Sequence, residues 1–286
     1  MCRSLVERHT RTGSLSDADD QPGTSLRPGS HFEYGWLRLH SRFPPVMGPW
    51  TRRLTLPLQT TLSFFENRLA ALREFEAEGL LHQVRVEEER VSVRLGDPNH
   101  LLTFGPRQLE VALLQPTGDL DRVATAVERV WKALDPARVS GPTFQFQWLV
   151  PLEDEYDTAR RRAIGSLLGQ SSVVSLTDWS MVLNAEGDKP PGVITLEMGI
   201  VEAAEAPQRL GRLTGLFRGQ GAETPPTIWT HESLPEVAFF VDMIWAAPKL
   251  VDATPEGVLS LWSEATTSAG ELVSELIRRI MGVDDE

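Results

Sequence analysis

The stretch LHQVRVEEERVSVRLGDPNHLLTFGPRQLEVALLQP, residues 81–116, decides the fold class that the sequence predicts. Apolar residues alternate with polar ones on both sides of the three glutamates at 87–89, and this polar centre suits a hairpin turn. Turn-forming breaks at 96–99 (GDPN) and at 105–106 (GP) then separate two further apolar runs. The stretch therefore predicts an antiparallel meander of short strands.

An amphipathic helix is expected before the meander, over residues 61–78. Ser63 and Glu66 have capping-box spacing near its start, and Gly79 stands just past its end, where glycine often terminates a helix. Apolar residues that recur three or four positions apart predict a stripe that faces the core. Its members are Leu62, Phe65, Leu69, Leu72 and Phe75.

Strand and helix patterns alternate along the rest of the chain. Strand patterns occupy residues 54–58, 144–150, 179–183, 193–201 and 237–245, and helical spacing occupies 119–134 and 156–168. A long helix from Pro255 to Met281, which Thr254 can cap, closes the chain. This order predicts an α+β fold, an antiparallel sheet or sheets with helices packed on one side.

Composition divides the chain into three parts. Residues 1–30 hold too few apolar side chains to offset the entropy of ordering them, so a disordered tail is expected. Residues 31–152 and 153–286 follow as an N-terminal and a C-terminal α+β half, each of them ββα-like. One continuous domain remains the alternative.

The composition excludes several classes of protein. Cys2 is the only cysteine among 286 residues, which rules out an internal disulfide and a multi-cysteine metal site. The net charge of −12 opposes broad attraction to phosphate backbones. Residues 1–30 lack the apolar run of a signal peptide, and the most apolar stretch elsewhere, 237–245, is short. We expect a cytoplasmic protein that neither spans nor binds a membrane.

No motif predicts catalysis, a cofactor or a metal. The segment GLFRGQG at 215–221 lacks the lysine and hydroxyl of a phosphate-binding loop. His231-Glu232 begins like a zinc-protease motif, but Pro235 stands where the second histidine is needed. The sequence also lacks the G-x-S-x-G pattern of a nucleophile elbow. No cofactor is expected, and enzymatic activity is disfavoured without being excluded.

The densest polar cluster stands at the start of the helix expected at 156–168. Four carboxylates there could bind a divalent cation. Acidic side chains are also stabilised by the dipole at a helix start and can pair with basic residues one turn later, so a solvated helix start is the favoured interpretation. The cluster comprises Glu153, Asp154, Glu155, Asp157 and Arg160.

Two of the eight tryptophans are candidate interface residues. Most tryptophans stand in periodic segments and are expected in the core or on a sheet face. Trp50 and Trp229 instead have Pro, Gly or Thr neighbours in expected loops. Exposed aromatic side chains commonly anchor protein interfaces, so these two residues could contact a partner.

Four segments carry a resemblance to a known family: LLTFGPRQLEVALLQP (101–116), DLDRVATAVERVWKAL (119–134), FQFQWLVPL (144–152) and VAFFVDMIWAAP (237–248) with the terminal helix. Over roughly residues 80–281 the chain resembles a sporadically distributed bacterial family of comparable length to which no function is assigned. The family tends to have an Arg-Tyr-rich strand where this chain has 143–148. The resemblance implies an α+β architecture and a patchy genomic distribution, which is typical of accessory genes, including defence genes. It carries over no catalytic residue.

Three functions stay open. The first is a non-catalytic protein-interaction module, within an accessory or defence-type bacterial system if the resemblance holds. The second is an enzyme or small-ligand binder whose site is assembled from scattered groups such as Glu153, Asp154, Arg160 and His231. The third and least favoured is nucleic-acid binding through an arginine face of Arg85, Arg90 and Arg94, which nearby glutamates oppose. Homo-oligomerisation is also left open.

Overall fold

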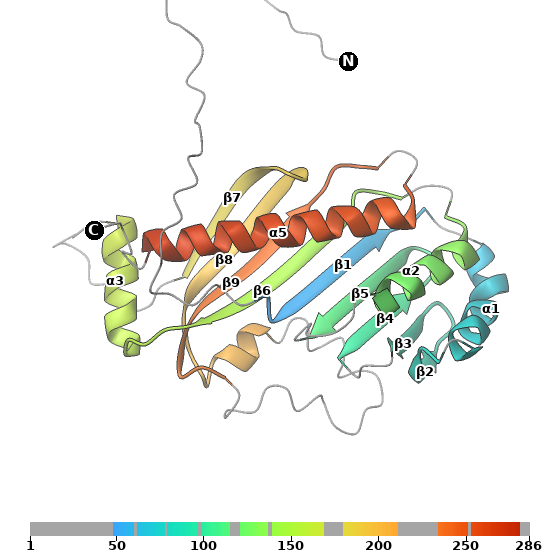
Figure 1. Ribbon diagram of the computed structural model, residues 1–286, viewed down its shortest axis with the longest axis horizontal. Coiled ribbons are helices and arrows are strands. Elements are labelled where there is room, and N and C mark those ends of the chain that lie inside the picture. The colour runs from blue at the N-terminus through green and yellow to red at the C-terminus, as the bar shows by residue number, and fades with distance from the viewer. Residues whose placement is uncertain are drawn as a thin grey trace, which may run out of the picture. The chain divides into compact units, whose positions relative to one another are not determined.

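Nine antiparallel strands form one sheet in the part of the chain that the structure describes (Figure 1). From one edge to the other, their order is β2-β3-β4-β5-β1-β6-β9-β8-β7. The structure is a computed structural model that describes residues 48–59, 62–77, 79–95, 99–114, 121–136, 139–168, 180–210, 234–250 and 253–280. The tail expected at 1–30 lies outside these residues.

The strands and helices confirm the predicted α+β class. The strands are β1 Thr51–Pro57, β2 Leu81–Val86, β3 Val91–Leu95, β4 His100–Phe104, β5 Gln108–Leu114, β6 Thr143–Pro151, β7 Ser180–Asp188, β8 Pro191–Glu202 and β9 Val237–Ala246. The helices are α1 Ser63–Ala77, α2 Asp121–Leu134, α3 Tyr156–Leu168 and α5 Pro255–Ile280, and residues 206–210 are also helical.

The predicted meander is present as β2 to β5, which pair with one another in sequence order. Its first turn closes where the Glu87 amide donates to the Arg90 carbonyl at 2.7 Å. Gly105 is required at the β4–β5 turn, because a Cβ there would lie 2.5 Å from the Glu89 carbonyl oxygen. The hairpin inferred from the glutamates is therefore confirmed.

One face of the sheet carries the main core. Alternate residues of each strand point to this face, as the two-residue period of a strand requires. They pack against buried residues of α1, α2, α3 and α5. Phe144, Phe146 and Trp148 of β6 and Phe239 and Val241 of β9 form its centre. The expectation that these helices cover one side of the sheet is confirmed.

Helix α1 begins differently from what the sequence predicted, but it ends as predicted. The Ser63 hydroxyl donates to the carbonyl oxygen of Leu134 in α2, so this side chain ties two helices together. At the other end the Gly79 prediction is confirmed: its φ is 67°, its amide donates to Glu76, and the Leu80 amide donates to Phe75. This pair of bonds is the Schellman arrangement that needs a left-handed residue.

The core-facing stripe predicted for α1 is wrong for three of its five members. Phe64, Ala71 and Phe75 are the buried residues of the helix. Leu62, Phe65 and Leu69 are 77%, 45% and 55% exposed. At about 100° of rotation per residue, the centres of the exposed set and of the buried set are about 130° apart around the helix, so the two sets form separate stripes. The helix has two apolar stripes. The three-or-four spacing of apolar residues in the sequence identified mainly the exposed stripe.

Helix α5 crosses the helix-covered face and contacts both α2 and α3 (Figure 1). Its predicted cap is confirmed, since the Gly257 amide donates to the Thr254 hydroxyl oxygen at 3.1 Å. Its buried residues recur every three or four positions, which keeps one stripe against the sheet. They are Val258, Trp262, Ala265, Ala269, Val273, Ile277 and Ile280.

The boundary expected near residue 152 falls directly after β6. All nine residues of β6, Thr143–Pro151, pair with β9, so one sheet runs through both halves. Residues 43–286 form one compact unit. Among the described residues, no helix has the length and apolarity needed to cross a bilayer.

Candidate functional site

The β7 edge of the sheet is a long and regular strand with exposed side chains. It pairs with β8 from Ser180 to Asp188 in one register without a bulge. Val182 is 61% exposed and Leu183 is 38% exposed, and these neighbours point to opposite faces of the sheet. β7 is the last strand at this edge of the sheet (Figure 1). Such an edge offers main-chain groups to a further strand.

Two glycines hold the β7–β8 hairpin against β9. A Cβ on Gly187 would lie 2.4 Å from the Trp245 ring, and a Cβ on Gly192 would lie 2.6 Å from the Ala246 carbonyl oxygen. The indole of Trp245 therefore lies directly on the backbone of the hairpin. Trp245 is 3% exposed, so this contact buries a large side chain against the hairpin.

The opposite edge, β2, is shorter and irregular. Its pairing with β3 is interrupted between Leu81 and Gln83, which is the register shift of a bulge. Arg85 forms an ion pair with Glu87 at 2.8 Å. Bulges and charged side chains are devices that discourage further strand pairing. Val84 and Val86 of β2 are nevertheless exposed.

The face of the sheet turned away from α1, α2, α3 and α5 has a buried polar network at its centre. The Thr51 hydroxyl donates to Gln147 Oε1 at 3.0 Å, and Gln147 Nε2 donates to Asp242 Oδ2 at 3.0 Å. Gln145 Nε2 donates to Asp242 Oδ1 at 2.8 Å. All four side chains are buried. The network links β1, β6 and β9 and satisfies polar groups that would be costly to bury alone.

A second polar group lies further along the same face. Arg53 Nε lies 2.7 Å from Glu110 Oε1, and Gln108 Nε2 donates to Glu110 Oε2 at 3.0 Å. Arg94 is 5% exposed, and burial lowers the pKa of its guanidinium. Burial likewise lowers the pKa of Arg52. Glu110 and Arg94 are buried, Arg52 and Arg53 are half-buried, and Gln108 is exposed.

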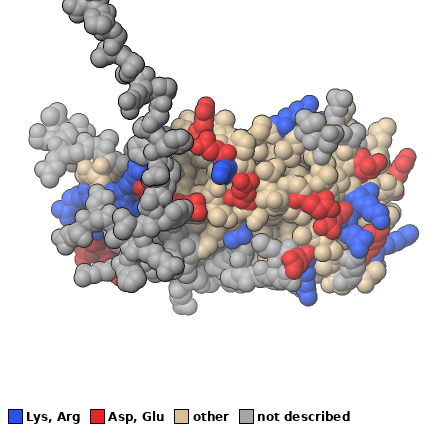
Figure 2. Space-filling model, turned by 45° about the horizontal axis from the view of Figure 1, so that its top comes forward, with Lys and Arg blue, Asp and Glu red and all other residues tan. Residues whose placement is uncertain are grey.

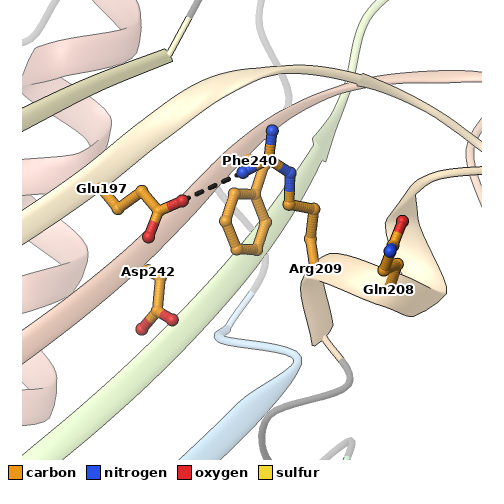
Figure 3. A pocket seen from close by; sticks show the side chains of 5 residues that line it. All are labelled: Glu197, Gln208, Arg209, Phe240 and Asp242. Atoms are coloured by element: carbon orange, nitrogen blue, oxygen red, sulfur yellow. Dashed lines mark hydrogen bonds and ion pairs between the residues drawn. The ribbon is translucent and has the colours of Figure 1, made fainter.

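A shallow pocket opens beside Asp242 (Figure 3). It encloses about 290 Å³ of empty space, part of it open to solvent. Arg209, from the helical residues 206–210, reaches over the sheet and places Nη1 3.0 Å from Glu197 Oε1. Glu197 and Asp242 are direct neighbours on β8 and β9. Gln208 and Phe240 complete the lining. The pocket is acidic, but both carboxylates already accept hydrogen bonds from the protein.

The predicted acidic cluster forms the start of α3. Asp154 pairs with Arg162 at 2.5 Å, and Asp157 pairs with Arg160 at 3.1 Å. The Glu155 carbonyl oxygen accepts the amides of the first turn, and the side chains of Glu153 and Glu155 are exposed. In the described part of the chain, no group of three or more His, Cys, Asp or Glu residues has a metal-binding arrangement.

The members proposed for a scattered ligand site do not meet in the pocket. Glu153, Asp154 and Arg160 all lie at the start of α3, and none of them lines it. His231 lies outside the described residues.

The two tryptophans proposed for an interface have different outcomes. Trp50 is half-buried, its amide donates to the Gln147 carbonyl at 2.7 Å, and it packs on a small apolar cluster around Leu149 and Phe240. It therefore helps to cover the sheet. Trp229 lies outside the described residues.

The arginine face proposed for nucleic acids is not assembled as an open surface. Arg94 is buried, and Arg85 is engaged by Glu87. Figure 2 shows acidic and basic side chains interspersed over the described part of the face in view, without a continuous basic area. Phosphate binding depends on such an area.

No family model and no curated protein matches the chain.

Sequence reasoning did not find the β7 edge or the Asp242 network. A strand was expected at 179–183, and the structure extends it to Asp188. The glutamines of β6 and the lone aspartate of β9 were visible as polar interruptions in apolar strands. Their meeting depends on the β6–β9 register, which pairs Gln147 with Asp242 across 95 residues. No local pattern reports that register.

Proposed function

We propose that the chain is a non-catalytic protein-interaction module that takes an extended segment of another protein as an additional strand beside β7. The observation that carries the proposal is the edge itself, in which Ser180–Asp188 pair with β8 without interruption and most side chains are exposed. In strand addition, main-chain hydrogen bonds supply the affinity and alternate side chains supply the selectivity.

The side chains of β7 indicate the chemistry of the partner. On the face that carries Asp242, β7 presents Val182, Asn184, Glu186 and Asp188 in alternation. An apolar side chain would pack beside Val182, and a basic one would meet the two carboxylates. The net charge of −12 also favours encounter with a basic segment. The partner segment is therefore extended, basic and partly apolar.

The test is direct binding of a fluorescent, capped peptide of alternating valine and lysine to the full chain, followed by anisotropy. Val182→Lys places a like charge against the peptide and is expected to weaken binding at least about tenfold. Val84→Lys is the matched control, because it makes the same change at an exposed valine of the β2 edge. It is expected to leave the affinity unchanged.

Hydrogen exchange locates the bound peptide. Amides within residues 180–188 are expected to gain protection on binding, whereas those within 81–86 are not. Absence of saturable binding would overturn the proposal. Equal loss of affinity in the two lysine variants would also overturn it, because the peptide would then respond to net charge and not to the β7 edge.

A further inference from the structure

The outer stripe of α1 has the pattern of a helix that packs against another helix. Leu62, immediately before α1, and Phe65, Leu69 and Leu72 within it are spaced by three, four and three residues, which is the a and d spacing of a heptad. The first three are exposed, and Leu72 is half-buried at the rim of the core. Exposed apolar residues that line up along one helix mark an interaction surface.

The rest of α1 leaves this stripe open. Asn67 Nδ2 donates to the Ala133 carbonyl at 3.0 Å, and Glu74 lies 3.8 Å from Arg129, so α2 occupies one side of α1. Phe64 and Phe75 occupy the side toward the sheet. The stripe lies on the remaining side of α1, and α1 itself lies at the end of the sheet opposite β7 (Figure 1).

A pair of opposite charges flanks the stripe. Glu66 and Arg73 each follow a stripe residue, Phe65 and Leu72, and they are seven residues apart, so both lie on the same flank. Both are exposed, and neither forms an ion pair within the described part of the chain. In heptad terms they occupy equivalent e positions, which select the partner and its direction.

We propose that the occupant of this stripe is the same stripe of a second copy of the chain, packed antiparallel about a twofold axis near Asn67. In that register Leu62 of one copy lies against Leu72 of the other, and Phe65 lies against Leu69. Each pair of residues that face each other across the contact is then apolar. An isologous contact of this kind needs a surface that is complementary to itself, and the stripe meets that condition.

The flanking charges fit the same register. When Leu62 faces Leu72 of the second copy, antiparallel heptad geometry brings Glu66 of each copy opposite Arg73 of the other, since e positions face each other on one side. The complex contains this ion pair twice. A parallel arrangement would instead set e positions against g positions and bring Arg73 of each copy opposite Arg68 of the other, which are like charges, so the charges select the antiparallel arrangement.

The opposite flank does not oppose the contact. Its nearest charge is Arg68, which would approach Arg68 of the second copy across the twofold axis. The Arg68 guanidinium is turned toward the β2–β3 turn, where Nη1 donates to the Glu88 carbonyl oxygen at 2.5 Å. It also lies 5.6 Å from the centre of the Phe64 ring. The Arg68 side chain is thus held against its own chain and away from the second copy.

Charge reversal tests the proposal in the full chain. Sedimentation velocity over a range of protein concentrations is expected to show a reversible dimer, because four apolar side chains per copy make a small interface. Glu66→Arg and Arg73→Glu each place like charges opposite one another and should weaken self-association at least about tenfold. An equimolar mixture of the two variants should form a heterodimer, since every facing pair is then opposite in charge.

The controls separate this register from general charge effects. Glu264→Arg makes the same charge change at an exposed position of α5 and should leave the dimer intact. Leu69→Asp should abolish self-association. A monomeric wild type, or single variants that fail to rescue each other, would overturn the proposal. Val182→Lys should still dimerise, and Glu66→Arg should still bind the valine-lysine peptide, so failure of the β7 proposal and failure of this one are distinguishable.

Discussion

The two edges of the sheet present apolar side chains in different ways. At the β2 edge the strand is short and bulged, and the exposed apolar residues continue on α1, a helix. At the β7 edge the strand is long and regular, and the exposed residues belong to the strand itself. A blocked edge with an exposed helix suits helix packing, and an open edge suits strand addition. The two proposals therefore assign a different kind of recognition to each edge of the sheet.

The separation of the two edges gives the proposals a joint consequence. Because β2 and β7 are the outermost strands, a dimer formed through α1 leaves a β7 edge at each far end. If the strand-addition proposal holds, the dimer is bivalent. Two linked sites bind a partner with two segments more tightly than either site alone, provided that the partner can span them.

The largest expected effect contrasts the two stripes of α1. Phe75 is fully buried, so Phe75→Ala leaves a cavity and is expected to lower the free energy of unfolding by about 3–5 kcal/mol. Phe65 is 45% exposed, and Phe65→Ala is expected to cost the monomer less than about 1 kcal/mol. Urea denaturation at a concentration where the chain is monomeric measures both. Equal losses would contradict the two-stripe description of α1.

An intermediate effect is expected at the β7 end. Gly192→Ala places a Cβ against the Ala246 carbonyl and the Trp245 ring, so backbone must shift, and a loss of about 2 kcal/mol is expected. Gly270→Ala in α5 is the control, because a Cβ there meets nothing within 4 Å. That change should stabilise the protein by up to about 1 kcal/mol through helix propensity. A neutral Gly192→Ala would mean that the hairpin does not depend on contact with Trp245.

Local elements were predicted well because their signals are local. The hairpin at 87–90, the bounds of α3 and the Thr254 cap follow from residues a few positions apart. The position of β1 between β5 and β6 does not, since it depends on pairing across tens of residues. Strand order therefore had to come from the structure.

The candidate surfaces were harder to predict for a different reason. Three-or-four spacing identifies an apolar stripe but not the side of the helix that faces the core, and α1 has a stripe on each side. Whether a strand is an edge depends on its neighbours, so the exposure of β7 is a property of the whole sheet. Trp50 shows the converse, since an expected loop residue is half-buried by long-range contacts.

The smallest expected effect lies near the C-terminal end of α5, the helix that contacts α3. A hydrogen bond from Arg279 lowers the pKa of Glu275, burial opposes this shift, and the charges of Arg278 and Arg279 add to it. A carboxyl whose pKa is lower in the folded state stabilises that state above its unfolded pKa. The contribution is lost as the pH falls through the lowered pKa.

Because Glu275 is partly exposed, solvent screens these ion pairs, and Glu275→Gln is expected to cost only about 0.3–0.5 kcal/mol at neutral pH. The cost should be smaller at about pH 3 than at neutral pH, because the carboxyl is then largely protonated in the unfolded chain and the contribution is lost as the pH falls toward the lowered pKa. Urea denaturation of wild type and variant at both pH values measures the difference. Glu271→Gln, an exposed change in the same helix, is the control. A loss that persists unchanged at low pH would assign the role of Glu275 to packing and not to its charge.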